Sequence, residues 1–134
     1  MIYLLDTNAI TDLSKRVTNV VAQRSRKFRE GHSIALCPPI YYENLRGLLK
    51  ANASAQIARL QGFKTTFDWQ PLTDDDWLQA AQFWADADNR GKRLSDIDLL
   101  LSALARRLDA IIVSADKDFD ALPVKREDWR LPSP

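Results

Sequence analysis

Short apolar runs alternate with longer amphipathic stretches along this chain. Apolar residues fill Ile2–Leu5 without interruption, which is too short for a helix and typical of a buried strand. Comparable runs at 33–36, 66–70 and 110–113 predict three more strands, and a last strand is expected near Val124. Short apolar strands that alternate with helices predict an α/β fold, in which helices cover both faces of a mainly parallel sheet.

The segments between these strands have the spacing of helices. The clearest covers 95–108, where apolar residues recur every three or four positions. Pro38-Pro39 is expected in the first turn of a helix that runs to about residue 51. Thr73 and Asp76 match a capping box, which predicts a helix from there to about residue 88. Further helices are expected over 9–14, 17–30 and 54–61, the last with Gly62 as its C-terminal cap.

The length of 134 residues and the 46% hydrophobic content predict a single domain over 1–134, with 131–134 as a frayed tail. Cys37 is the only cysteine, so a disulfide within the chain is excluded and a reducing, cytoplasmic setting is expected. His32 is the only histidine, which excludes a zinc site built from His and Cys. No apolar stretch approaches the roughly 20 residues of a transmembrane helix, and Asp6 interrupts the N-terminal run, so neither a membrane span nor a signal peptide is expected.

Four acidic residues are expected to meet at one edge of the sheet. In a parallel α/β fold, the carboxyl ends of strands and the amino ends of helices share an edge. Asp6 and Asp116 each follow a predicted strand, while Glu43 and Asp98 lie near the starts of predicted helices, with Asp96 beside Asp98. Crowded carboxylates repel one another, and Mg²⁺ or Mn²⁺ relieves that repulsion. The pattern therefore favours metal-assisted hydrolysis of a phosphodiester.

Each acid also has a purely structural interpretation. The triplet after the first strand could form a turn in which Asn8 caps a helix. Ser95 and Asp98 match a capping box, Asp116 could cap or belong to a loop, and an exposed helical residue such as Glu43 is common. A purely structural role explains any one of these acids well. It explains less well the combination of two strands followed by Asp with two acids near helix starts.

Both ends of the chain carry motifs of a known family. The segment IYLLDTNAITDL resembles the opening strand and first acid of the PIN-domain nucleases, and LSDIDLLLSALARRLDAIIVSADKDF resembles their C-terminal signature. The chain is most similar to the VapC-type toxins of bacterial toxin–antitoxin pairs, in length and in order of elements. This resemblance implies a three-layer α/β/α fold, Mg²⁺- or Mn²⁺-dependent endoribonuclease activity, a homodimer, and inhibition by a VapB-type antitoxin in the active-site groove.

The resemblance also implies roles for the acids. Asp6 and Asp98 would be the principal metal ligands, and Asp116 would complete the metal site directly or through water. Glu43 would orient or deprotonate the attacking water. The family usually has Ser or Thr shortly before this second acid, whereas this chain has Cys37-Pro38-Pro39, so Glu43 departs furthest from the pattern.

Three further residues would surround the metal site. Asn8 and Ser114 would hold carboxylates or waters in place. Asp96 would serve there too, and it would replace Asp98 if the helix began one residue differently. The apolar run after Asp98 favours Asp98, as in the family.

The net charge of +1 hides an uneven distribution of cations. Lys92 and Arg93 precede the Asp98 helix and Arg46 follows Glu43, so these three are candidates for binding RNA phosphates. The basic segment 15–29 either binds RNA or is simply solvated. The region 40–62 is a candidate antitoxin groove, with its aromatic residues either there or in the core. Trp77 and Trp84 are seven residues apart, which is core spacing.

Two alternative functions stay open. A PIN-like module that has lost catalysis would bind RNA or protein only, and a housekeeping RNA-processing nuclease would have no antitoxin. An aspartyl phosphatase is disfavoured because Asn8 stands where its second Asp belongs, and the chain has no GxxxxGK[ST] loop for a nucleotide. The sequence does not choose the RNA.

Overall fold

The expected apolar strands build one sheet in the computed structural model, which describes residues 1–132. Strand β1 (Ile2–Leu5) lies at its centre, with Tyr3 opposite Ile34 of β2 (Ser33–Leu36) and opposite Ile111 of β4 (Ile111–Val113). Strands β3 (Asp68–Trp69) and β5 (Lys125–Glu127) form the two edges. All four pairings are parallel, and the strand order is β3-β2-β1-β4-β5.

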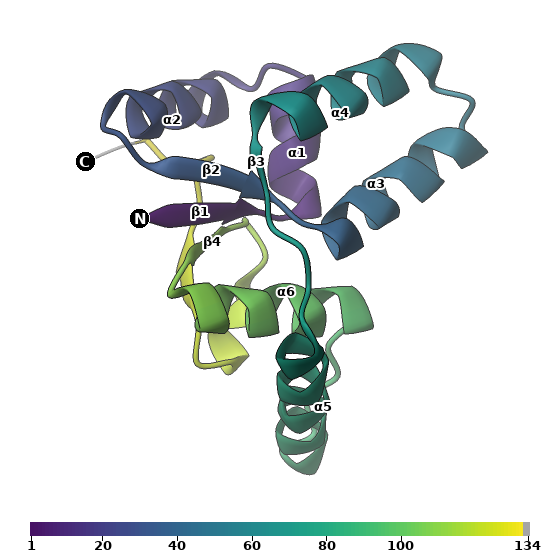
Figure 1. Cartoon of the computed structure of the whole chain (residues 1–134), viewed down its shortest axis with the longest axis vertical. Coiled ribbons are helices and arrows are strands. Elements are labelled where there is room, and N and C mark those ends of the chain that lie inside the picture. Colours follow the sequence, from purple (N-terminus) through teal and green to yellow (C-terminus); the bar gives the residue numbers. More distant parts are fainter. Residues whose placement is uncertain (133–134) are drawn as a thin grey trace.

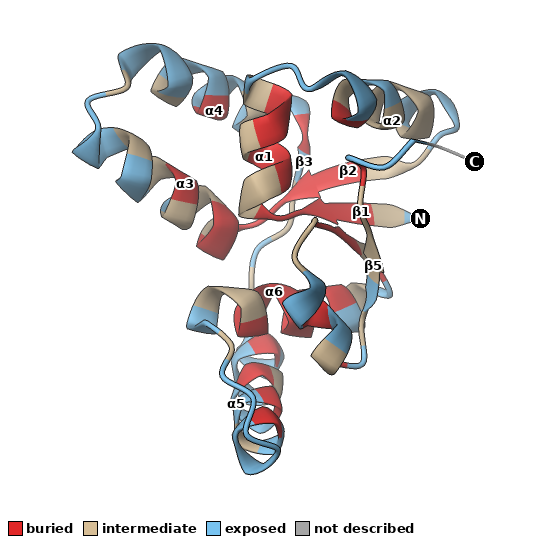
Figure 2. Ribbon diagram, turned by 180° about the vertical axis from the view of Figure 1, so that it is seen from behind, coloured by how far each residue is buried: buried red, intermediate tan, exposed pale blue. Residues whose placement is uncertain are grey.

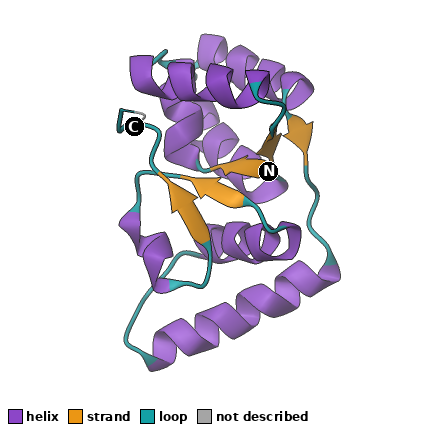
Figure 3. Ribbon diagram, turned by 90° about the vertical axis from the view of Figure 1, so that its left-hand side faces the viewer, coloured by secondary structure: helices purple, strands orange, loops and turns teal. Residues whose placement is uncertain are grey.

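Helices cover both faces of this sheet, which confirms the three-layer α/β prediction (Figure 1). One face carries α1 (Thr7–Ser14), α2 (Thr18–Arg29), α3 (Pro38–Lys50) and α4 (Ser54–Thr66). The other carries α6 (Asp96–Leu108) and the short 3₁₀ helix η1 (Lys117–Ala121), while α5 (Asp74–Asn89) packs on the side of α6 that faces away from the sheet (Figure 3).

The core lies where the sheet meets α1, α3 and α6. Leu4, Leu36, Leu101 and Ile112 are fully buried, and the buried positions form continuous surfaces on the sheet and on the inner helix faces (Figure 2). Because the central strands are buried on both sides, they are apolar throughout rather than alternating. The capping box at the start of α5 is present, with the Thr73 backbone N–H donating to Asp76 Oδ2 at 2.9 Å.

Two helix boundaries differ from the expectation. Helix α4 continues through Gly62 to Thr66, so Gly62 is not its C-terminal cap. The extra turn places Phe63 against Phe67, with ring centroids 5.3 Å apart, and this packing favours helix over an early stop. The following strand is correspondingly shorter than predicted, at Asp68–Trp69. Helix α1 begins at Thr7, with Asp6 as its N-cap, so the interpretation of Asn8 as the cap is wrong.

The expected burial of two tryptophans is also wrong. Trp77 and Trp84 are 58% and 53% exposed, because the buried face of α5 carries Ala80, Phe83 and Ala87 instead, the first two packed against α6. These three residues share a face with helical spacing equal to that of the tryptophans, so the sequence period alone could not choose between the faces.

The strand order creates a switch point between β1 and β4. From β1 the chain crosses to β2 and then β3 on one side, and it returns through α5 and α6 to β4 on the other. The helices that connect these strands therefore lie on opposite faces of the sheet on the two sides of this point (Figure 1). Ligands of open α/β sheets bind in the crevice outside the strands' carboxyl ends at such a point.

Of the expected frayed tail, residues 133 and 134 lie outside the described residues, and Leu131 is 61% exposed. Among residues 1–132, none of the helices combines the length and the apolar composition that crossing a bilayer requires.

Candidate active site

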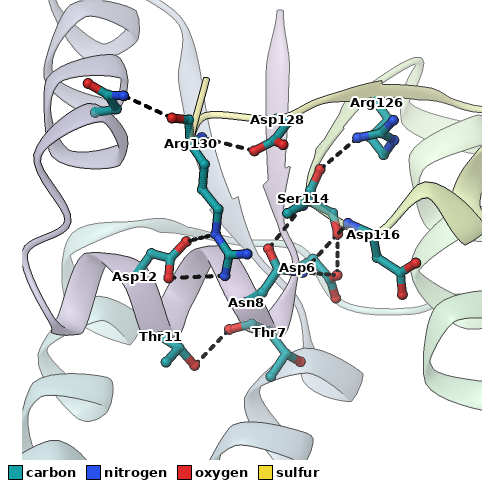
Figure 4. A network of polar contacts seen from close by, with 12 residues as sticks. Asp6, Thr7, Asn8, Thr11, Asp12, Ser114, Asp116, Arg126, Asp128 and Arg130 are labelled. Carbon is teal, nitrogen blue, oxygen red and sulfur yellow. Dashed lines mark hydrogen bonds and ion pairs between the residues drawn. The ribbon is translucent and has the colours of Figure 1, made fainter. Parts of the chain in front are cut away.

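Asp6 stands at the switch point, directly after β1, and is only 5% exposed. Its backbone N–H donates to the carbonyl of Val113 at 3.0 Å, which ties the ends of β1 and β4 together. Its Oδ2 accepts hydrogen bonds from Ser114 Oγ at 2.7 Å and from Asn8 Nδ2 at 3.1 Å (Figure 4). Residues from two segments more than 100 positions apart therefore fix the orientation of this carboxylate.

Ser114 and Asn8 also hold the loop that follows β4. Asn8 Nδ2 donates to Ser114 Oγ at 2.9 Å, and Asn8 Oδ1 accepts from the Ala115 N–H at 3.1 Å. Ser114 Oγ accepts from the Asp116 N–H at 3.0 Å. Asp116 caps η1 through Oδ1, which accepts a hydrogen bond from the Asp118 N–H at 2.9 Å. The expectation that Asp116 could serve as a cap is therefore confirmed.

Glu43 reaches the site from the second turn of α3. The Thr7 hydroxyl at the start of α1 donates a hydrogen bond to Glu43 Oε1. Arg46, one turn further along α3, places its Nη2 3.8 Å from Glu43 Oε2 and its guanidinium 5.1 Å from the centroid of the Tyr42 ring. Arg46 therefore forms an ion pair with Glu43, next to which it lies on α3.

Asp98 and Asp96 point in different directions from the start of α6. Asp98 is partly buried, and the Ser95 Oγ accepts a hydrogen bond from its backbone N–H at 3.1 Å. Asp96 is exposed and lines a hollow of about 410 Å³ together with Trp77 and Trp84. This placement favours Asp98 over Asp96 as the acid that faces Asp6.

The four acids act on one another electrostatically. Burial raises the pKa of Asp6, and the charges of Glu43 and Asp116 raise it further against the opposing hydrogen bond from Ser114. The pKa of Asp98 rises to about 6, first through burial and then through the charge of Asp6, with Asp116 and Glu43 contributing. Glu43 and Asp116 thus lie near enough to Asp6 for their charges to act on it, and all three act on Asp98, while the role of the four acids as one site stays a prediction.

The donor set fits a hard divalent cation. Among residues 1–132, no three His, Cys, Asp or Glu side chains already have their ligating atoms gathered around one point. The charges of neighbouring carboxylates nevertheless raise the pKa values of Asp6 and Asp98, and a cation at this place would relieve that repulsion. All the donors are oxygens, the kind that Mg²⁺ and Mn²⁺ prefer. His32 lies elsewhere, with its Nδ1 3.1 Å from the amino group of Met1.

The basic candidates lie at different distances from the acids in the fold. Lys92 and Arg93 are exposed in the loop between α5 and α6, immediately before the helix that carries Asp98. Arg29 and other cations of α2 precede β2. They therefore lie toward the amino ends of the strands, whereas the acids lie at the carboxyl ends. Of the aromatic candidates, Tyr41 packs on the core with its ring 5.7 Å from that of Trp69, and Tyr42 is 56% exposed.

Sequence reasoning missed two residues that contact this site. Thr7 donates a hydrogen bond to Glu43, and the sequence signal for it is its place in the Asp6-Thr7-Asn8 triplet, a pattern that is also typical of a simple turn. Arg126 of β5 donates to the Ser114 carbonyl at 3.1 Å, and nothing in the local sequence marks it.

A family model described as PIN domain matches residues 3–125. The chain belongs to the PIN-domain family. This PIN domain is 32% identical over 124 residues to the VapC ribonuclease Mb1587 of Mycobacterium bovis and to the ribonuclease VapC11 of Mycobacterium tuberculosis, covering 89% of the chain and 90% of each relative.

Solved structures confirm the PIN fold. VapBC2 from Rickettsia felis, bound to a promoter DNA fragment, superposes with a TM-score of 0.87 at 19% identity, covering 96% of this PIN domain and 99% of that chain. VapBC-1 from nontypeable Haemophilus influenzae gives a TM-score of 0.83 at 21% identity, covering 96% and 98%. The family resemblance and the fold expected from the sequence are thereby confirmed.

Proposed function

We propose that this PIN domain is a ribonuclease that hydrolyses phosphodiester bonds in RNA and acts as the toxin of a toxin–antitoxin pair. The observation that carries the proposal is its 32% identity, over most of both chains, to proteins named as VapC ribonucleases. The convergence of four acids at the switch point of the sheet supports hydrolysis at that place. A solved neighbour with a TM-score of 0.71 is described as a sarcin–ricin loop cleaving toxin, which is consistent with RNA as substrate.

Asp6 and Asp98 would hold Mg²⁺ or Mn²⁺, and Asp116 would complete the metal site directly or through water. When bound, such a cation neutralises charge on the phosphodiester and lowers the pKa of a water molecule. Ser114 and Asn8 orient the Asp6 carboxylate by hydrogen bonds to a single oxygen, Oδ2. Preorientation of this kind lowers the cost of assembling the site when the substrate binds.

Glu43 is the general-base candidate. Thr7 donates to Oε1 and Arg46 Nη2 lies 3.8 Å from Oε2, so both carboxylate oxygens have a partner that fixes the orientation of the side chain. Glu43 would orient the attacking water and accept its proton. Lys92 and Arg93 would bind phosphates of the RNA next to the scissile bond.

The protein partner would be a VapB-type antitoxin. Several solved neighbours are VapBC toxin–antitoxin complexes, including one from Salmonella typhimurium with a TM-score of 0.85. A hollow of about 160 Å³ between α1, α3 and α4, with Leu48, Leu60 and Phe63 in its lining, lies in the 40–62 region expected to receive an antitoxin segment. The homodimer that the family resemblance implies stays a prediction for sedimentation analysis.

The decisive experiment measures RNA cleavage by the purified protein. We expect cleavage of RNA with Mg²⁺ or Mn²⁺, none with excess chelator, and a loss of roughly several orders of magnitude in Asp6→Asn, because that change removes a charged ligand. Growth arrest on expression, relieved by co-expression of the neighbouring reading frame, would assign the toxin role.

The matched control is Asp88→Asn. Asp88 is an exposed acid on α5, so this variant removes the same charge without touching the cluster and should cleave like the unchanged protein. Undiminished cleavage by Asp6→Asn would contradict the proposed site, and RNA binding without cleavage by the unchanged protein would favour an inactive PIN-like module.

A further inference from the structure

Arg126 is a largely buried cation beside the acidic cluster. It lies on β5, just beyond residues 3–125 that the PIN-domain model matches, and its side chain is only 15% exposed. Strand β5 pairs with β4, with Arg126 opposite Ile112, so the side chain is close to the loop that follows β4. A cation so little exposed needs partners that satisfy its donors.

Those partners are the two ends of the loop that carries Asp116. Arg126 Nη1 donates to the Ser114 carbonyl at 3.1 Å (Figure 4). Nε and Nη2 donate to the two carboxylate oxygens of Asp120, both at 2.9 Å. One planar guanidinium therefore joins residues 114 and 120, a geometry that a lysine could not reproduce with a single ammonium.

Ser114 transmits this restraint to the cluster. Its carbonyl is held by Arg126, while its hydroxyl donates to Asp6 and accepts from the Asp116 N–H. Arg126 is also a nearby positive charge for the cluster: the hydrogen bond with Asp120 raises its pKa most, and the charge of Asp116 contributes. Arg126 thus lies near enough to Asp116 for the two opposite charges to attract each other.

We propose that Arg126 is a positioning residue that fixes the Ser114–Asp120 loop, and through it Asp116 and Asp6, in the geometry that binds the divalent cation. This inference rests on the proposed function for the cation itself, whereas the restraint on the loop stands on the contacts above.

The adjacent residue provides a matched control. Lys125 also lies on β5 and also forms an ion pair with a carboxylate, its Nζ being 2.9 Å from Asp109 Oδ1. Both partners are exposed, at 60% and 80%, and Asp109 lies at the other end of β4 from the cluster. Lys125→Gln thus removes a cation and an ion pair from the same strand without releasing the loop.

The first measurement is Mn²⁺ binding to the full chain, followed by the electron paramagnetic resonance signal of free Mn²⁺. We expect Arg126→Gln to weaken binding by about tenfold, since losing a residue that supports metal ligands costs roughly 10–100-fold. Arg126→Lys should be intermediate, and Lys125→Gln should bind like the unchanged protein. Equal affinities for Arg126→Gln and Lys125→Gln would overturn the inference.

The second measurement is amide hydrogen exchange without metal. The N–H groups of Asp116 and Asp118 bond within this loop, and that of Ala115 bonds to the Asn8 side chain of α1, so all three report on how firmly the loop is held. Arg126→Gln should speed their exchange while amides of α3 and α6 stay protected; uniform acceleration throughout the protein would indicate general destabilisation and contradict a positioning role. An unchanged protein that bound no Mn²⁺ would contradict the proposed function, and exchange would still decide whether Arg126 holds the loop.

Discussion

Asp98 shows how burial and neighbouring charge combine at one residue. Burial raises its pKa first, the charge of Asp6 adds to this, and the result is about 6. An acid whose pKa is higher in the folded than in the unfolded state destabilises the fold whenever it is charged. The destabilisation is absent below about pH 4, grows between about pH 4 and 6, and is complete above pH 6.

We therefore expect Asp98→Asn to stabilise the metal-free protein above pH 6. The gain in the free energy of unfolding should be about 1 kcal/mol, after allowance for solvent screening of a side chain that is only partly buried. The gain should vanish below about pH 4, where the native acid is protonated in both states. Urea unfolding in the presence of chelator, at pH 4 and pH 7, measures the difference.

Asp96→Asn is the comparison that separates two adjacent acids on one helix. Asp96 is exposed beside Trp77 and Trp84, so its variant should show little change at either pH. With saturating Mn²⁺, Asp98→Asn should become less stable than the unchanged protein. Binding of Mn²⁺ stabilises only the protein that keeps the Asp98 carboxylate as a metal ligand. A pH-dependent gain in Asp96→Asn, and none in Asp98→Asn, would reverse the assignment.

At the residue scale, sequence reasoning reached the acids but not the residues that hold them. Asp6 and Asp116 follow strands, and that position alone predicts the edge at which they meet. Thr7 and Arg126 act through contacts with Glu43 and Ser114, which are 36 and 12 positions away. Contacts of this kind depend on how elements pack, and a local pattern does not contain that information.

At the scale of elements, α5 and α6 are joined by an ion pair between a buried carboxylate of α5 and an exposed arginine of α6. Arg107 Nε and Nη2 donate to the carboxylate of Asp76 at 2.8 and 3.0 Å, and Asp76 is only 1% exposed. Burial alone would raise the pKa of Asp76, but the hydrogen bonds from Arg107 and from the Thr73 backbone outweigh it and lower that pKa. The capping box alone was visible in the sequence, because Arg107 is a full helix away.

Removing the Arg107 side chain should therefore destabilise the protein more than is usual for an exposed residue of a helix. We expect Arg107→Gln to lower the free energy of unfolding by about 2 kcal/mol at pH 7, since it leaves a buried carboxylate without its cation. Because the folded pKa of Asp76 is lowered, this stability is present above its ordinary value of 3.8 and is lost as the pH falls through the folded pKa. The difference from the native protein should shrink accordingly in acid.

Arg106→Gln is the control for that measurement. Arg106 is exposed and donates to the Pro123 carbonyl at 3.4 Å, so its loss should cost less than about 0.5 kcal/mol. Equal losses in the two variants would mean that the pair with Asp76 contributes nothing beyond removal of a surface charge.

For the whole molecule, the order of the strands decides where the chemistry can occur. The α/β class and the shared edge followed from alternating elements, yet the order β3-β2-β1-β4-β5 did not, because it depends on which strands pair across 30 to 110 residues. That order places β1 beside β4 and so brings Asp6 to Ser114 and Asp116. The α5–α6 loop, with Lys92 and Arg93, directly precedes α6, whose first turn carries Asp98.

The salt dependence of RNA binding tests this placement of charge. In an Asp6→Asn background, which we expect to bind RNA without cleaving it, Lys92→Gln/Arg93→Gln should weaken binding of bulk tRNA. The negative slope of log affinity against log salt should become shallower by about 1.5, because each lost phosphate contact removes about 0.7 to 0.9 from its magnitude. Lys15→Gln/Arg29→Gln removes the same net charge from the ends of α1 and α2, on the face of the sheet opposite to α5 and α6, and should leave the slope nearly unchanged. If both pairs lowered the slope equally, the RNA would follow the net charge of the molecule rather than a path beside Asp98.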